Sequence, residues 1–171
     1  MTKNQPVQSA LPGGAGGENI LILHNIRSVQ NVGAMFRTAE AAVIDKIYLT
    51  GITPTPLDRF GQVRKDLAKS ALGAEKFIAW ESKKSPLALI SKLRREKFSI
   101  IAVEQAKNSV DYKKIQPRNK NAFLAGSEVS GLPKNILEKC DLIAEIPMRG
   151  RKESLNVSVA LGIALFRILN V

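Results

Sequence analysis

Short apolar runs alternate with helix-like segments along most of this chain. Strand-like runs cover residues 19–24, 44–50, 76–80, 98–104, 121–125 and 141–146, and helical patterns cover 31–43, 59–73, 85–97, 133–140 and 155–169. This alternation is typical of an α/β domain with a mainly parallel sheet. The run from Phe98 to Val103 is almost continuously apolar, which predicts a sheet covered by helices on both faces.

The last helical segment, 155–169, is apolar on nearly every side. A helix without a polar face has to be buried, so we expect it to lie deep in the fold or against a second subunit. The segment is shorter than a bilayer requires and contains Asn156, Ser158 and Arg167, and no apolar signal-type segment opens the chain. These features favour a cytoplasmic protein with no membrane partner.

The length and charge of the chain limit its organisation and its partners. With 171 residues, 44% of them hydrophobic, it can build one core but not two ordinary domains. The Gly-rich start predicts a flexible N-terminal tail over residues 1–18, followed by one domain over 19–171. Lys and Arg number 26 against 15 Asp and Glu, a net charge of +11. Such a charge attracts a polyanion, either nucleic acid or an anionic membrane surface.

Cysteine and histidine occur once each, as Cys140 and His24. One chain therefore cannot form a disulfide framework or a Cys/His metal cage, and Ser-His catalysis lacks most of its parts. We expect no metal site. We expect Cys140 to be a small buried apolar residue and His24, which ends an apolar strand, to be a hydrogen-bonded structural residue.

The first of three motifs runs from Asn31 to Arg37, at the start of the helix that follows strand 19–24. Asn31 stands at a cap position, and Arg37 lies on a different side of the helix from its apolar residues. These apolar residues are Val32, Met35, Phe36, Ala39 and Val43. One interpretation is a capped helix with a solvated arginine. The other places Arg37 at the carboxyl edge of the sheet, where α/β folds bind ligands and a guanidinium can hold a phosphate.

The second motif begins with Gly126, Ser127 and Glu128, directly after strand 121–125. A strand that ends in glycine lets another group approach its backbone. Glu128 then lies in the loop before a helix that Pro133 is suited to begin. The carboxylate either complements the dipole of that helix or accepts hydrogen bonds that orient a ribose or a neighbouring cation.

The third motif comprises Ile146 to Gly150, followed by Ser154, Leu155 and Asn156 at the start of the apolar helix. Ser154 and Asn156 are natural helix caps. A loop shaped by Pro and Gly before a buried helix start also has many amides and carbonyls to satisfy. A bound heterocycle could use them, so the motif also predicts a ligand loop built from backbone.

In this order and with this spacing, the three motifs resemble those of the SpoU (TrmH-like) family of SPOUT RNA 2′-O-ribose methyltransferases. Ile-Pro-Met joined to Ser-Leu-Asn-Val-Ser-Val-Ala is the most specific part, and the resemblance covers residues 19–171. It implies the α/β-knot fold, with a mainly parallel sheet, helices on both faces and a C-terminal trefoil knot. It also implies a homodimer with the active site at the interface, S-adenosyl-L-methionine as cofactor, and tRNA or rRNA as substrate.

The resemblance also implies roles for individual residues. The family's catalytic positions fall on Asn31, Arg37, Glu128, Ser154 and Asn156, and its cofactor contacts fall on Gly126, Ile146, Met148 and Leu155. Arg37 is the base that is proposed for the family, but a guanidinium normally stays protonated. We therefore expect Arg37 to clamp the RNA phosphate and to lower the cost of forming the ribose alkoxide, whether or not it takes the proton.

Clusters of basic residues predict where RNA binds. Besides Arg37, the candidates are Arg59, Arg64 and Lys65, and, within the third motif, Arg149 and Arg151. Each cluster is also compatible with a solvated face. Together they predict binding through the phosphate backbone, with an affinity that falls steeply with salt. Aromatic residues make up 5% of the chain, so base stacking on a sheet surface is not indicated.

Two other functions compete with the methyltransferase. A non-catalytic RNA-binding or ribosome-assembly dimer would keep the fold but has no evident need for the full catalytic set. A Rossmann-type dinucleotide enzyme requires Gly-x-Gly-x-x-Gly after the first strand, and residues 25–30 offer no such turn.

Overall fold

The computed structural model describes residues 17–171, so most of the predicted tail, residues 1–16, lies outside the described residues. Within this range, seven strands form one parallel sheet in the order β3-β2-β1-β6-β4-β7-β5. Their bounds are β1 Glu18–His24, β2 Lys46–Thr50, β3 Ala79–Lys83, β4 Ser99–Val103, β5 Val110–Asp111, β6 Lys120–Ala125 and β7 Leu142–Glu145. The predicted parallel α/β sheet is confirmed, and β1 begins at Glu18, one residue before the first predicted strand.

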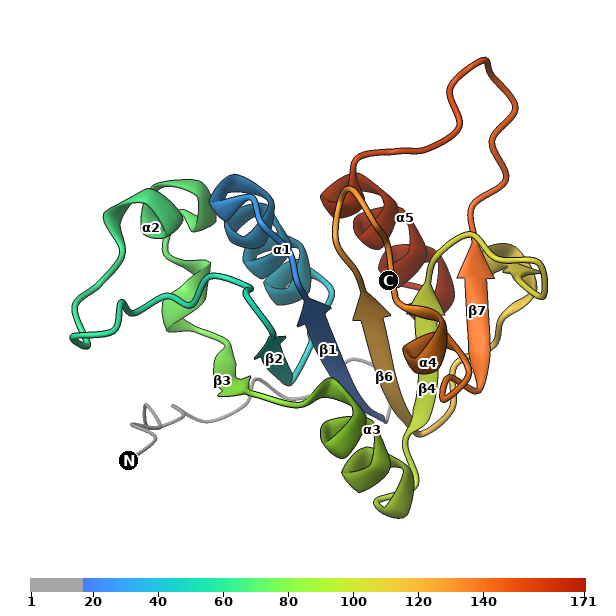
Figure 1. Ribbon diagram of the computed structural model, residues 1–171, viewed down its shortest axis with the longest axis horizontal. Coiled ribbons are helices and arrows are strands. Elements are labelled where there is room, and N and C mark those ends of the chain that lie inside the picture. The colour runs from blue at the N-terminus through green and yellow to red at the C-terminus, as the bar shows by residue number, and fades with distance from the viewer. Residues whose placement is uncertain (1–16) are drawn as a thin grey trace.

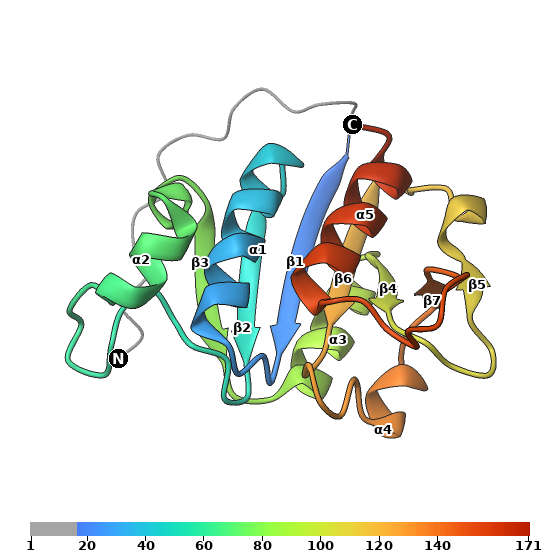
Figure 2. The same cartoon turned by 90° about the horizontal axis from the view of Figure 1, so that it is seen from above.

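Helices cover both faces of the sheet, as predicted (Figure 1). One face carries α1 (Val29–Ala41), α2 (Lys65–Ala71) and α5 (Val157–Leu169), and the other carries α3 (Pro86–Arg95) and α4 (Lys134–Leu137) (Figure 2). Short 3₁₀ turns, η1 (Ala74–Lys76) and η2 (Tyr112–Lys114), complete the fold. Neighbouring residues of β6 bury their side chains in opposite layers, Phe123 in one apolar core and Leu124 in the other. The sheet is therefore buried on both sides.

The start of α1 differs in detail from the sequence prediction. Ser28 is the N-cap, because its Oγ accepts a hydrogen bond from the amide of Asn31 at 3.2 Å. Asn31 lies inside the helix, which leaves its side chain free to bond elsewhere. The predicted apolar face is buried except for Val43, which follows the helix in a left-handed conformation and is 37% exposed.

The predicted helix 59–73 and strand 76–80 are both misplaced. Residues 59–64 form a turn instead, since Asp58 Oδ1 accepts hydrogen bonds from the amides of Phe60 and Gln62. The helix α2 starts at Lys65 and ends at Ala71, and its C-cap Leu72 adopts a left-handed conformation. The chain then makes the turn η1, so that β3 begins three residues later than predicted.

The path of the chain after β7 brings distant segments together. The chain returns from β7 across β4 and β6, and α5 packs beside α1 on the same face (Figure 2). Because all strands are parallel, the loops that follow β1, β6, β4 and β7 leave the same edge of the sheet. The second and third motifs lie in these loops, and the first lies in α1, directly after the loop that follows β1.

The last helix, α5, is only partly buried in this chain. Leu161, Ala164, Leu165 and Ile168 are buried, whereas Val159, Ile163 and Phe166 are 49%, 37% and 40% exposed. The sequence predicts that this helix lies deep in the fold or against a second subunit. In this chain, one face of α5 packs in the fold and the other face is uncovered. Within residues 17–171, no helix combines the length and apolar character that crossing a membrane requires.

Candidate functional site

A cavity of about 460 Å³ lies at the carboxyl edge of β4, β6 and β7. Three segments form most of its walls: residues 103–105 at the end of β4, residues 126–132 after β6, and the loop 146–156 that leads into α5. It is lined by all four predicted cofactor residues, Gly126, Ile146, Met148 and Leu155, and by the predicted catalytic residues Glu128, Ser154 and Asn156. The structure thus brings the second and third motifs to one site.

Gly126 is required by a close approach between two parts of the second motif. A Cβ atom on Gly126 would lie 2.7 Å from the carbonyl carbon of Gly131 and 2.7 Å from the Leu132 side chain. The segment folds back because the amide of Gly131 donates to the carbonyl of Ser127 at 2.9 Å. The predicted backbone approach at Gly126 is therefore confirmed, and it shapes one wall of the cavity.

Glu128 ties the second motif to the first. Its Oε2 accepts a hydrogen bond from the amide of Arg27 at 3.0 Å, and its Oε1 accepts from the amide of Ser28 at 3.2 Å and from Asn31 Nδ2 at 2.9 Å. Burial acts to raise the pKa of Glu128, but these hydrogen bonds outweigh it, so the pKa lies below its ordinary value. The carboxylate is ionised at neutral pH and serves the N-terminus of α1, not that of α4.

Asn31 links Glu128 to the third motif. Its Nδ2 donates to the carboxylate, so its Oδ1 faces the opposite way and accepts from Asn156 Nδ2 at 3.2 Å. Asn156 Oδ1 in turn caps α5 by accepting from the amides of Ser158 and Val159. One hydrogen-bonded chain, Glu128–Asn31–Asn156, therefore connects all three motifs. Ser154 does not cap α5 as predicted; it lies exposed in the loop and lines the cavity.

Arg37 lies outside this constellation in a single chain. It is exposed on α1 and does not line the cavity. The next residue, Thr38, faces Gly162 of α5, where an added Cβ would lie 3.5 Å from Thr38 Cγ2. Arg37 itself is exposed on the outer side of α1, one helical turn after Gly33, which packs against Ser70 of α2.

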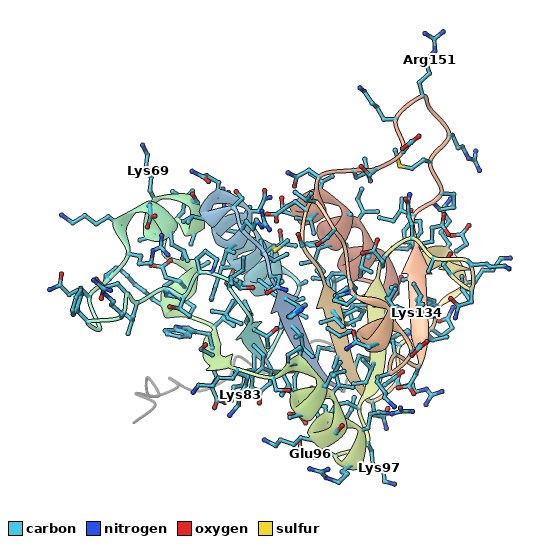
Figure 3. The ribbon with its side chains drawn as sticks, in the orientation of Figure 1. Lys69, Lys83, Glu96, Lys97, Lys134 and Arg151 are labelled. Atoms are coloured by element: carbon cyan, nitrogen blue, oxygen red, sulfur yellow. The ribbon has the colours of Figure 1, made fainter. Side chains whose placement is uncertain are left out.

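Apart from Arg37, the predicted RNA-binding residues form two separate groups. Arg149 and Arg151 are exposed on the loop between β7 and α5, which projects from the body of the molecule (Figure 3). Arg59, Arg64 and Lys65 lie at the other end of the sheet, before and within α2. There, Arg59 stacks over the Phe60 ring at 4.7 Å, and Arg64 pairs with Asp66 at 2.7 Å, which raises the pKa of Arg64.

Sequence reasoning missed Glu104 and Gln105, which also line the cavity. Glu104 Oε2 accepts from the amide of Leu132 at 3.0 Å, and Gln105 Nε2 donates to the carbonyl of Glu153 at 2.9 Å. The signal that could have identified them is their position, since two polar residues end the apolar run of β4 at the edge where ligands bind.

The prediction for His24 agrees with the structure, whereas Cys140 is only partly buried, at the edge of one apolar core. His24 is buried, with Nδ1 at 2.9 Å from Thr50 Oγ1 and Nε2 at 3.1 Å from Asn25 Nδ2, and burial lowers its pKa. Burial raises the pKa of the Cys140 thiol to about 12. Across residues 17–171, no three His, Cys, Asp or Glu side chains cluster as a metal site would require.

The region of the chain that holds this cavity and its motifs also matches known proteins. Residues 18–166 match the SpoU rRNA Methylase family. A protein of Staphylococcus aureus (strain MSSA476) that is assigned to the TrmH family of tRNA/rRNA methyltransferases is 28% identical over 153 residues, which are 90% of this chain and 59% of that protein.

Solved structures with this fold include two at comparable identity. The AdoMet-bound rRNA methyltransferase from Sinorhizobium meliloti has a TM-score of 0.80 at 29% identity, over 91% of this chain and 57% of that one. A TrmH/SpoU tRNA modifying enzyme from A. aeolicus has a TM-score of 0.78 at 25% identity, over 90% of this chain and 74% of that one. This chain thus spans less than two thirds of the length of the S. aureus and S. meliloti proteins.

Proposed function

Because this chain belongs to the SpoU rRNA methylase family, we propose that it transfers a methyl group from S-adenosylmethionine to a ribose 2′-hydroxyl of tRNA or rRNA. The observation that carries the proposal is the chain of hydrogen bonds Glu128–Asn31–Asn156, which joins the three motifs beside one cavity. A purely structural set of caps would not need polar residues from three separate segments of the chain to converge there.

The cavity suits the proposed cofactor. Its volume of about 460 Å³ falls in the range of about 300–1,000 Å³ that small-molecule sites occupy. Leu132, Leu137 and Leu155 supply apolar wall, and the backbone of the loops 126–132 and 146–156 supplies amides and carbonyls. When bound, S-adenosylmethionine supplies an electrophilic methyl group on sulfonium sulfur.

We also propose a homodimer formed through the uncovered face of α5. Val159, Ile163 and Phe166 follow each other along this face, Leu155 directly precedes the helix, and all four are 37–49% exposed. A continuous apolar stripe of this kind is typical of a protein interface. Leu155 also lines the cavity, so burying this face would bring the partner subunit next to the cofactor site. The C-terminal trefoil knot of the family stays a prediction.

The dimer gives Arg37 a role that one chain alone does not. Arg37 is exposed on α1, and we propose that it approaches the cavity of the partner subunit. A guanidinium stays protonated, so Arg37 holds an RNA phosphate and stabilises the ribose alkoxide while the proton of the 2′-hydroxyl passes to solvent water. Glu128 is a poor base because its lowered pKa and its hydrogen bonds favour the ionised form. Its role is to position Asn31.

The basic residues of the loop 146–156 support binding of the RNA backbone close to the cofactor. Arg149 and Arg151 are exposed on the loop that also carries the cavity-lining residues Met148 and Ser154, whereas the group around Arg59 precedes and begins α2 at the other end of the sheet (Figure 1). We propose that Arg149 and Arg151 contact phosphates near the target ribose. Arg59, Arg64 and Lys65 then contact a more distant part of the same RNA.

The direct test is to incubate the purified protein with labelled S-adenosylmethionine and total RNA that lacks its own modifications, and to map the 2′-O-methyl groups. Arg37→Ala is the matched variant, and we expect it to bind the cofactor normally while losing most methyl transfer. Absence of labelling in every RNA class would refute the enzyme and favour a non-catalytic RNA-binding dimer. A transfer rate of Arg37→Ala within a few-fold of wild type at saturating RNA would refute the role of Arg37.

A further inference from the structure

Two adjacent residues outside the three motifs, Glu104 and Gln105, lie between the loops that form the cavity. We propose that this pair positions the two cofactor loops relative to each other and so sets the affinity for S-adenosylmethionine. The inference rests on the proposed function for the identity of the cofactor. The two residues are positioning residues, because they act through the loops that they hold.

Glu104 holds the loop 126–132. Its Oε2 accepts a hydrogen bond from the amide of Leu132 at 3.0 Å, and its Oε1 accepts from the amide of Gln105 at 2.9 Å. Its own amide donates to the carbonyl of Ala144 in β7 at 3.1 Å. The carboxylate also packs directly against Gly131, where an added Cβ would lie 2.5 Å from Oε2. Gly131 has a φ of +63°, so both its conformation and its contact with Glu104 favour glycine.

Gln105 holds the other loop. Its Nε2 donates to the carbonyl of Glu153 at 2.9 Å. Within residues 17–171, this is the one hydrogen bond that connects residues 147–155 to the rest of the chain. The loop otherwise projects into solvent, with Arg151 near its tip (Figure 3). Loss of the Gln105 amide would therefore release this loop between its two ends.

The arrangement matters because the cavity needs both loops at a fixed separation. Glu104 and Gln105 are consecutive, so the end of β4 holds one loop through each side chain. A ligand that binds between ordered loops does not have to order them, which improves its affinity. A single neutral hydrogen bond contributes roughly fivefold to such an equilibrium. We therefore expect Gln105→Ala to raise the cofactor Kd about fivefold.

The test is calorimetric titration of S-adenosylmethionine into wild-type protein, Gln105→Ala and the control Glu153→Ala. The control removes a neighbouring side chain but keeps the main-chain carbonyl that Gln105 binds. We expect weaker binding for Gln105→Ala and unchanged binding for Glu153→Ala. Because Gln105 is exposed, urea unfolding of the free Gln105→Ala protein should match wild type, which separates positioning from a general loss of stability.

Trypsin gives a second measurement that does not require the cofactor. The loop offers cleavage sites at Arg149, Arg151 and Lys152, all of which are exposed. Initial cleavage in this loop should be faster in Gln105→Ala than in wild type or Glu153→Ala, because the loop has lost its tether. Equal cleavage rates, or equal Kd values for wild type and Gln105→Ala, would overturn the inference.

The two proposals fail in different ways. If wild-type protein does not bind S-adenosylmethionine, the proposed function fails, and the trypsin comparison still decides whether Gln105 tethers the loop. Glu104 is tested with Glu104→Ala, which we expect to bind the cofactor more weakly, and with Glu104→Gln, whose oxygen can still accept from Leu132 and should restore part of the affinity. Equal, undiminished affinity in both variants would remove Glu104 from the inference.

Discussion

Glu128 is the shared acceptor of the network that joins the motifs, so Glu128→Gln should weaken that network measurably. The carboxylate accepts three hydrogen bonds, whereas a glutamine amide has one oxygen and one NH₂ group, which only donates. With its oxygen in place of Oε1, the amide keeps Ser28 and Asn31 but turns its NH₂ group toward the amide of Arg27. In the other orientation it loses two donors.

The expected cost follows from these contacts. A hydrogen bond to a charged acceptor contributes about 1.5–3 kcal/mol, and water can compensate part of the loss at an exposed position such as Glu128. We expect Glu128→Gln to lower the free energy of unfolding by about 1–2 kcal/mol at neutral pH. The rate of methyl transfer should fall by more than the loss of stability explains, because Asn31 loses the partner that orients its contact with Asn156.

This difference should depend on pH in a defined direction. The folded-state pKa of Glu128 lies below its ordinary value of 4.5. The stabilisation from the ionised carboxylate is therefore fully present above pH 4.5 and is lost as the pH falls through the folded-state pKa. The stability difference between wild type and Glu128→Gln should consequently shrink in that acidic range.

Urea unfolding followed by circular dichroism measures both effects. The matched control is Glu138→Gln, because Glu138 is exposed on the surface and its cationic neighbour Lys134 is 3.8 Å away. Such a surface pair contributes little, so the control should stay within about 0.5 kcal/mol of wild type. Equal free energies of unfolding for the two variants at pH 7 would refute the reasoning about Glu128.

Four further predictions concern other parts of the molecule. Gly126→Ala should lower the free energy of unfolding by about 1–3 kcal/mol, because its Cβ would collide with the backbone of Gly131; thermal and urea unfolding measure this cost, and a stability equal to wild type would contradict it. Val159→Asp should convert dimer to monomer in light scattering after size exclusion, whereas an unchanged mass would exclude α5 from the interface. Arg151→Ala should weaken RNA binding and reduce the slope of log K against log salt by about one unit, and an unchanged slope would remove it from the phosphate contacts. Cys140, with a pKa raised to about 12, should resist alkylation at pH 8 until the protein unfolds, so rapid labelling of the native protein would contradict the raised pKa.

Local sequence patterns predicted most of the secondary structure, because strands and helices here have clear apolar periodicities. The errors fall where short-range hydrogen bonds override periodicity. The carboxylate of Asp58 turns residues 59–64 out of the predicted helix, and Leu72 ends that helix in a left-handed conformation. At α1, Ser28 rather than Asn31 serves as the N-cap. Both residue types are good helix caps, so the sequence alone does not decide between them.

The sequence by itself determined the elements, the three motifs and, through its resemblance, the residues that belong to a site. Tertiary structure decided which of them meet. Asn31 bonds to Glu128 and Asn156, which are 97 and 125 residues away along the chain, and only the strand order β1-β6-β4-β7 brings their loops to one edge. Glu104 and Gln105 acquire their roles in the same way. Periodicity fixes which face of an element is buried, whereas hydrogen bonds between loops depend on the packing of the whole sheet.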